Sequence, residues 1–358
     1  MRSAAYLQMR DELAKEAREK KTPLFGHFEL TARCNLDCKM CYIHNQKNSE
    51  YLSKELTTEQ WKHIFDEAIE RGMSFVSLSG GECLLRKDFK ELYLHLWNKQ
   101  VFVTVLTNGT LLNDDFVDFF KTYPPDTIQI SLYGSNEEGY LNVTGHKGFE
   151  KALSAIKALE TVGIDVLVAV TASKYMKDDY VKILKLCKDN DFRVRNGEIQ
   201  LVQNREDQGK DDYFLTQEDI ISLSIQRAEL NKKVIPFENP PETCGPMREP
   251  PKNGLICSAG TCLVTVTWEG VMYPCFNAMV GGPSLLKMSF AEAWKVVVQA
   301  TEKILLGAEC VDCPYSKTCS KCPAFRLKDL HSGHCNPNMC ELTRKLVAAG
   351  AKKLKPVD

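Results

Sequence analysis

The chain has 358 residues, of which 44% are apolar and 26% charged, so it can bury a core and is not disordered by composition. Its formal net charge of −1 at pH 7 gives no overall field that would attract nucleic acid or an anionic membrane. No apolar stretch is long enough to cross a bilayer, and residues 2–21 form a charged helical pattern rather than a signal peptide. We therefore predict a cytoplasmic protein with neither a nucleic-acid nor a membrane partner.

After a helical extension over residues 1–24, strand-like and helix-like segments alternate between residues 25 and 235. This alternation is typical of βα units around a parallel sheet. The expected strands are His27–Thr31, Phe75–Ser79, Val101–Thr107, Thr127–Leu132, Ile164–Thr171 and Glu198–Val202. Six units are too few to close an eight-stranded barrel, so we predict an α/β fold with a partial (β/α)6 barrel like an open TIM barrel.

One helix between the first two strands has clear start and stop signals. Thr57 and Gln60 form a capping box, and Leu56 and Trp61 are placed as a hydrophobic staple. Apolar residues then recur on one face until Gly72, which ends the helix.

A change in composition follows the sixth unit. Six prolines crowd residues 236–251, which neither a helix nor a central strand accommodates. We predict a linker over residues 236–256 and a second, smaller domain over residues 257–358. A surface helix is expected near its end, over residues 341–355.

Cysteine is the unusual component. The chain has fifteen cysteines, an odd number, and no secretion signal, which disfavours a disulfide framework. Cysteines clustered at short spacings favour metal binding, whereas an isolated one such as Cys187 is typical of a buried apolar position.

Cys34, Cys38 and Cys41 follow the first strand in a Cx3Cx2C loop. Three thiolates can hold three irons of a cubane cluster, and the local lack of a fourth leaves one iron open, as a catalytic site requires. Ligands of such sheets gather at the carboxyl ends of the strands, where this loop is expected.

With this loop, the chain resembles the radical S-adenosylmethionine (SAM) superfamily. The resemblance extends to Ser79-Gly-Gly-Glu82, Thr107-Asn-Gly-Thr110 and Ser131-Leu-Tyr-Gly134, each at the end of an expected strand. It implies a [4Fe–4S] cluster that reductively cleaves SAM to a 5′-deoxyadenosyl radical, which removes a hydrogen atom from the substrate. The SAM-binding residues that it implies are Met40, Gly80, Gly81, Glu82, Asn108, Ser131 and Thr171.

Nine cysteines lie between residues 257 and 340. Structural zinc is one interpretation, because paired CxxC motifs commonly bind it. Their order, with Cx12Gx4C from Cys257 to Cys275 and then CxxCx5C from Cys310 to Cys319, instead resembles the SPASM extension of radical SAM enzymes. The last CxxC departs from that family, where three residues usually separate the pair.

The SPASM resemblance implies two auxiliary [4Fe–4S] clusters, hence three clusters in all. The first would use Cys257, Cys262, Cys275 and Cys322. The second would use Cys310, Cys313, Cys319 and a late cysteine, for which the context of Cys340 fits better than that of Cys335. The sequence assigns no role to Cys244.

SPASM-type enzymes mostly modify peptides or proteins, so the resemblance implies a peptide or small-protein substrate and a flavodoxin- or ferredoxin-type reductant. We favour maturation of a ribosomally made peptide through a cross-link, a thioether or another oxidative change. A separate peptide-recognition protein could deliver the substrate. Sulfatase maturation, small-molecule or cofactor biosynthesis by the same chemistry, and a non-catalytic iron–sulfur electron carrier remain alternatives.

Two single residues bear on these alternatives. Cys83 follows Glu82, so it is a candidate catalytic thiol, although a buried free cysteine is more often a small packed residue. Sulfatase maturases carry an aspartate directly after the cysteine that matches Cys275, whereas this chain has Phe276. Phenylalanine cannot accept a proton, which argues against formylglycine formation.

Overall fold

The structure is a computed structural model. It describes residues 4–43, 49–195, 213–231, 257–304, 310, 313–316, 318–319 and 337–353. Within these ranges, no helix is both long and apolar enough to span a bilayer. The predicted linker and both of its boundaries lie outside the described residues, so the division into domains at residues 235 and 257 stays a prediction.

The described strands form one sheet in the order β5-β4-β3-β2-β1-β6-β7, in which only the β6–β7 pair is antiparallel. The strands are β1 (Phe25–Glu29), β2 (Phe75–Ser79), β3 (Phe102–Thr107), β4 (Thr127–Ser131), β5 (Val166–Ala169), β6 (Leu263–Val266) and β7 (Met272–Tyr273). The first five predicted strands are confirmed, most of them shorter than expected. The sixth, Glu198–Val202, lies outside the described residues.

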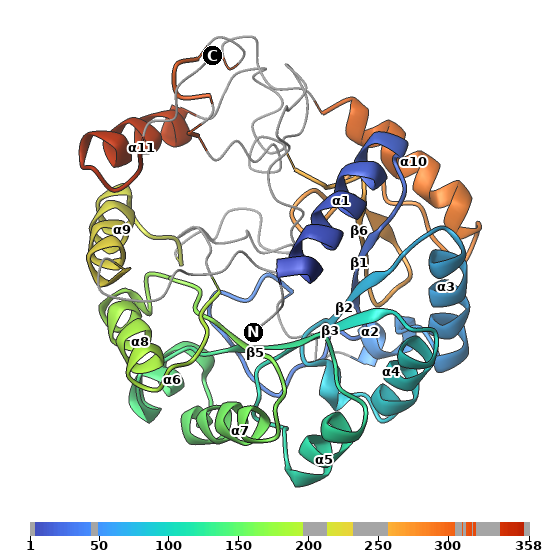
Figure 1. The fold of residues 1–358 in the computed structure, drawn as a ribbon, viewed down its shortest axis with the longest axis horizontal. Coiled ribbons are helices and arrows are strands. Elements are labelled where there is room, and N and C mark those ends of the chain that lie inside the picture. The colour runs from blue at the N-terminus through green and yellow to red at the C-terminus, as the bar shows by residue number, and fades with distance from the viewer. Residues whose placement is uncertain are drawn as a thin grey trace.

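Helices surround the strands, which gives the partial barrel in Figure 1. They are α1 (Ala4–Lys20), α2 (Ser49–Lys54), α3 (Thr58–Glu70), α4 (Phe89–Asn98), α5 (Asp114–Thr122), α6 (Glu137–Thr144), α7 (Phe149–Thr161), α8 (Lys177–Asp189), α9 (Gln217–Asn231), α10 (Phe290–Glu302), α11 (Pro337–Ala348) and the 3-10 turn η1 (Cys83–Leu85). The predicted capping box is present at α3, where Thr57 Oγ1 accepts from Gln60 N and the Gln60 side chain accepts from Thr57 N. We thus confirm an α/β partial barrel.

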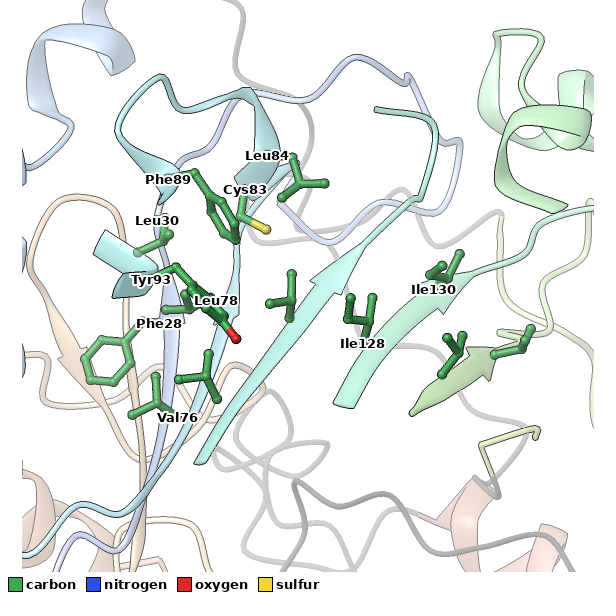
Figure 2. Packing of buried hydrophobic residues seen from close by; sticks show 14 of the residues in the cluster. Phe28, Leu30, Val76, Leu78, Cys83, Leu84, Phe89, Tyr93, Ile128 and Ile130 are labelled. Atoms are coloured by element: carbon green, nitrogen blue, oxygen red, sulfur yellow. The ribbon is translucent and has the colours of Figure 1, made fainter. Parts of the chain in front are cut away.

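Alternation along the strands separates an apolar face from a polar one. Phe28 makes ring contacts with Trp61 and Phe65 of α3, and Val76 and Leu78 of β2 lie in register with β1 in the same buried cluster (Figure 2). Because side chains alternate along a strand, the intervening residues point to the other face, into the barrel. That inner face carries His27, Glu29, Ser77, Thr104, Gln129 and Thr265, all buried.

Helix α1 covers the amino ends of the strands. The buried Arg10 guanidinium lies 5.3 Å from the Phe25 ring centroid and 5.6 Å from that of Phe75, the first residues of β1 and β2. Tyr6 contacts the ring of Phe102, at the start of β3. A helix is thus present within the predicted extension, and its buried face covers the end of the barrel opposite the strands' carboxyl ends.

Part of the predicted second domain joins the barrel. Strand β6 pairs in parallel with β1, and Trp294 of α10 donates from Nε1 to the carbonyl of Lys21 at 2.7 Å. The predicted C-terminal helix is present as α11 but is shifted toward the N-terminus relative to the expected residues 341–355. It begins at Pro337, whose missing N–H costs nothing in the first turn, and it ends before Gly350, which has a φ of 68°.

Candidate active site

The three cysteines Cys34, Cys38 and Cys41 lie in the loop that leaves the carboxyl end of β1, and none of them forms a disulfide. Between them, the backbone N–H groups of Asp37 and Lys39 donate to the carbonyls of Thr144 and Val143, at 2.8 and 3.0 Å. The loop is therefore held against the last turn of α6 while it presents its thiols.

The environment of Cys34 and Cys38 disfavours the ionisation of these two thiols. Burial raises the pKa of Cys34 to about 12, and the nearby Glu82 and Cys41 add to the shift. Burial, followed by Cys41 and Cys34, raises the pKa of Cys38 well above its ordinary value. Three thiolates can persist so close together only beside positive charge, which bound iron supplies.

A single metal ion suits the loop less well than a larger group. Among the described residues, no three His, Cys, Asp or Glu side chains converge closely enough to hold one ion. Three sulfurs from one loop fit three irons of an iron–sulfur cluster. The cysteine loop would hold that cluster.

Gly80 and Gly81 lie against the backbone of this loop. Gly81 N donates to Thr31 O and Glu82 N donates to Arg33 O, both at 2.7 Å. A Cβ atom would lie 2.3 Å from Thr31 O at Gly80 and 2.3 Å from Arg33 O at Gly81. Gly80 also has a φ of 132°, which side chains other than glycine rarely adopt. Both glycines are thus needed to seat the cysteine loop on β2.

Glu82 is fully buried and uses both carboxylate oxygens within the protein. Oε1 accepts from Thr107 Oγ1 at 2.8 Å and from Leu84 N at 3.1 Å, and Oε2 accepts from Asn108 N at 2.8 Å. Burial raises the pKa of Glu82, although these hydrogen bonds oppose the shift. Hydrogen bonds to the Glu82 carboxylate therefore link the carboxyl ends of β2 and β3. The expected contact of Glu82 with SAM stays a prediction.

The other predicted SAM-binding residues occupy the same edge of the sheet. Asn108 follows β3, and its Nδ2 lies 3.8 Å from Cys34 Sγ. Ser131 ends β4 and is half-buried, as is Thr171, which follows β5. Met40 is buried in the main core. These placements agree with one shared site, while the individual contacts with SAM remain predictions.

Cys83 is fully buried in the core that Figure 2 shows. Its thiol lies 3.3 Å from the carbonyl oxygen of Leu106, to which it donates, and burial raises its pKa well above the ordinary value. These contacts favour a structural role for Cys83 as a small residue packed in the core. They do not support catalysis by this thiol, which stays a prediction.

No sequence motif indicates the charged side chains that hold the start of the cysteine loop. Glu55 accepts from Thr31 Oγ1 and pairs with Arg33, whose Nη2 lies 2.9 Å from Oε2. The buried Arg86 donates from Nη1 to the carbonyls of Leu30 and Leu56, at 3.0 and 3.1 Å. These residues come from three separate segments, so no local motif could reveal that they meet.

A second unpredicted group lies on the inner face of the barrel. Glu29 is fully buried, and Tyr42, next to Cys41, donates to its Oε1 at 3.5 Å. The Phe276 ring lies 5.5 Å from the His27 ring and 5.8 Å from the Tyr42 ring. The residue after Cys275 thus reaches the barrel interior beside the cysteine loop.

The later cysteines are only partly within the described residues. Cys257 and Cys275 pack against one small cluster, whereas Cys262 is buried in another, with Leu24 and Phe25. The described cysteines Cys310, Cys313, Cys319 and Cys340 form no disulfide either. Cys244, Cys322 and Cys335 lie outside the described residues, so the two predicted sets of auxiliary ligands stay predictions.

The family comparison agrees with this geometry. A model of the radical SAM superfamily matches residues 28–187, from β1 to α8, which include the cysteine loop and the Gly-Gly-Glu turn. Residues 28–187 are a radical SAM domain. The chain is accordingly an enzyme, and the cofactors of this superfamily are a [4Fe–4S] cluster and SAM. When bound, they supply radical chemistry that removes a hydrogen atom from a substrate.

Three curated relatives match this radical SAM chain. The AdoMet-dependent heme synthase of Methanosarcina barkeri is 27% identical over 316 residues, 83% of this chain and 90% of the relative. The sporulation killing factor maturation protein SkfB of Bacillus subtilis is 30% identical over 166 residues, 46% of this chain and 40% of the relative. The subtilosin biosynthesis protein AlbA of the same species is 36% identical over 151 residues, 42% of this chain and 33% of the relative.

Solved structures share the radical SAM fold over most of the chain. SuiB of Streptococcus suis, bound to SAM, matches with a TM-score of 0.71 and 16% identity, covering 95% of this chain and 84% of SuiB. The enzyme anSMEcpe with bound AdoMet matches with a TM-score of 0.71 and 17% identity, covering 92% of this chain and 97% of its own. The chain thus has the fold of these two proteins over most of its length.

Proposed function

We propose that this radical SAM enzyme modifies a ribosomally made peptide by forming a cross-link, a thioether or another oxidative change. Support comes from SkfB and AlbA, whose names describe maturation of peptides, although each match spans less than half of the relative. A likeness of fold adds to it, because SuiB also matches in its complex with the precursor peptide SuiA, with a TM-score of 0.67.

One structural observation carries the proposal furthest. The inner face of the barrel is lined by buried polar side chains and is closed by α1 at the amino ends of the strands. The cysteine loop lies at the opposite, carboxyl end. A substrate would therefore meet hydrogen-bonding groups close to the place where the radical forms. Such a lining suits backbone amides and polar side chains of a peptide better than a purely apolar molecule.

The test uses the anaerobically reconstituted enzyme with SAM, dithionite and each short peptide encoded beside its gene. We expect one peptide to lose two hydrogen atoms by mass spectrometry and to raise formation of 5′-deoxyadenosine above the rate without peptide. Unchanged masses for every peptide would contradict the proposal. In the cell, we propose that a flavodoxin or ferredoxin serves as the reductant in place of dithionite. A separate peptide-recognition protein would deliver the peptide, and its addition to the assay would then raise turnover.

A second candidate is a cofactor-biosynthetic enzyme. The heme synthase is matched over 90% of its length, more than SkfB or AlbA. An iron porphyrin haem precursor in place of the peptide tests this candidate in the same assay. Decarboxylation of the porphyrin, together with unmodified peptides, would favour it over peptide modification.

Three [4Fe–4S] clusters complete the proposed cofactors, one held by Cys34, Cys38 and Cys41 and two by the later cysteines. We expect anaerobic reconstitution to give about twelve irons per chain, with thiolate ligation throughout. Iron and zinc are measured together by inductively coupled plasma mass spectrometry. About four irons with zinc in the remaining sites would contradict the two auxiliary clusters and favour structural zinc.

We further expect no formylglycine from a sulfatase-derived peptide that carries Cys or Ser at the modified position. Phe276 occupies the position at which sulfatase maturases have an aspartate that acts as a base. Its ring packs beside His27 and Tyr42. A phenyl ring cannot accept the substrate's proton. The expected result is SAM cleavage with an unmodified peptide by mass spectrometry. Formylglycine over several turnovers would require another base, for which Glu29, the buried carboxylate that accepts from Tyr42, is the candidate.

A further inference from the structure

Asn108 belongs to a closed ring of hydrogen bonds beside Cys34. Its Nδ2 donates to Asn35 Oδ1 at 2.9 Å, Asn35 Nδ2 donates to Thr110 Oγ1 at 2.8 Å, and Thr110 Oγ1 donates back to Asn108 Oδ1 at 2.6 Å. Thr110 N donates to the same oxygen at 2.9 Å. Rotating the Asn108 amide by half a turn would set its oxygen against Asn35 Oδ1 and its NH₂ against Thr110 N–H. The ring therefore fixes the orientation of this amide.

The protein uses the whole hydrogen-bonding capacity of the Asn108 side chain. A carboxamide has two N–H donors and two acceptor positions on its oxygen. The oxygen accepts twice from Thr110, and the nitrogen donates to Asn35 and, at 3.8 Å, to Cys34 Sγ. Asn108 is buried, so it does not exchange these partners freely with water. Each donor and acceptor of this amide therefore has a partner among the described residues.

The backbone of Asn108 is held equally firmly. Its N–H donates to Glu82 Oε2 at 2.8 Å, and the neighbouring Thr107 hydroxyl donates to Glu82 Oε1 at 2.8 Å. The carboxylate of the Gly-Gly-Glu turn thus fixes the residue whose amide points at a cysteine of the cluster loop. Movement of Asn108 away from Cys34 would break both sets of contacts.

We propose that Asn108 is a positioning residue that donates a hydrogen bond to the Cys34 sulfur and so raises the reduction potential of the cluster held by Cys34, Cys38 and Cys41. The reduced cluster carries one more negative charge than the oxidised cluster. An N–H dipole directed at a ligand sulfur stabilises that charge, and hydrogen bonds to sulfur are a known determinant of cluster potential. The inference depends on the radical SAM site and is independent of the substrate.

The test compares the reconstituted full chain with Asn108→Leu, which keeps the side-chain volume and removes the amide. Thr110→Val is the milder variant, since it removes the hydroxyl of the ring but keeps the backbone donor to Asn108 Oδ1. Asn190→Leu is the control, because that exposed amide bonds only the carbonyl of Leu186 at the end of α8. The midpoint potential is measured by redox titration of the electron paramagnetic resonance signal that changes on addition of SAM, and the Kd for SAM by equilibrium dialysis.

We expect Asn108→Leu to lower the midpoint potential, Thr110→Val to lower it less, and Asn190→Leu to leave it unchanged. The Kd for SAM should change by less than about twofold, whereas loss of a direct hydrogen bond to SAM would weaken binding by roughly fivefold. An unchanged potential with weakened SAM binding would overturn the proposal. If Asn108→Leu fails to hold iron, the midpoint potential of Thr110→Val alone tests the proposal. An unchanged midpoint potential in Thr110→Val would then overturn the proposal.

Discussion

Replacement of Cys34, Cys38 and Cys41 together by alanine is expected to abolish the formation of 5′-deoxyadenosine from SAM. The three thiols share one loop held against α6, and burial raises the pKa of two of them, Cys34 and Cys38. Without them the cluster that cleaves SAM has no ligands. The measurement is product formation by liquid chromatography after incubation with SAM and dithionite.

The triple variant should still fold, and it should lose only about four of twelve irons, because the later cysteines would keep theirs. Cys187→Ala is the matched control: this thiol is buried in α8, within the core and outside the cysteine loop. It should lower stability modestly and leave SAM cleavage in place. Formation of 5′-deoxyadenosine by the triple variant would show that the cluster site has been assigned to the wrong cysteines.

Gly80→Ala is expected to lower the free energy of unfolding by about 3 kcal/mol and to reduce SAM cleavage strongly. The new Cβ would lie 2.3 Å from Thr31 O, and the residue would keep a φ of 132°. Relief of that contact requires the cysteine loop to move away from β2. Stability is followed by urea denaturation and cleavage by 5′-deoxyadenosine formation.

Two other glycines separate the causes of this effect. Gly163 has a φ of 83° but no atom within 4 Å of its would-be Cβ, so Gly163→Ala measures backbone strain alone, about 1 kcal/mol. A Cβ on Gly81 would lie 2.3 Å from Arg33 O without a positive φ, so Gly81→Ala measures close contact alone. Equal losses of stability for Gly80→Ala and Gly163→Ala, with SAM cleavage intact in both, would mean that seating of the loop does not depend on Gly80.

The local signals in the sequence were sufficient for several elements. The capping box at Thr57 begins α3 as predicted, because both of its partners lie within four residues. Strand β2 has the predicted bounds, since turn residues limit it at both ends. The short spacing of Cys34, Cys38 and Cys41 likewise identified the cluster loop, and the resemblance that it carries is confirmed by the superfamily match.

Other features depend on residues that are distant in the sequence. No pattern indicated that β6, more than 230 residues after β1, would pair with it, because parallel pairing is decided by which edge of the sheet is free. Helix α11 begins at Pro337, before the predicted start at Glu341, because the fixed φ and missing N–H of proline suit the first turn of a helix.

The sequence by itself determined the residue types of the site, their order and the presence of a radical SAM domain. Only the tertiary structure decided how those residues act on one another. Glu82 and Asn108 both appear in the sequence as residues that could contact SAM. In the fold, the Glu82 carboxylate accepts hydrogen bonds from Thr107, Leu84 and Asn108. The side-chain amide of Asn108 donates to the sulfur of Cys34. Each of these side chains has only a few donors and acceptors, so the neighbours that folding brings within reach decide which partners they bond. Those neighbours come from separate strands.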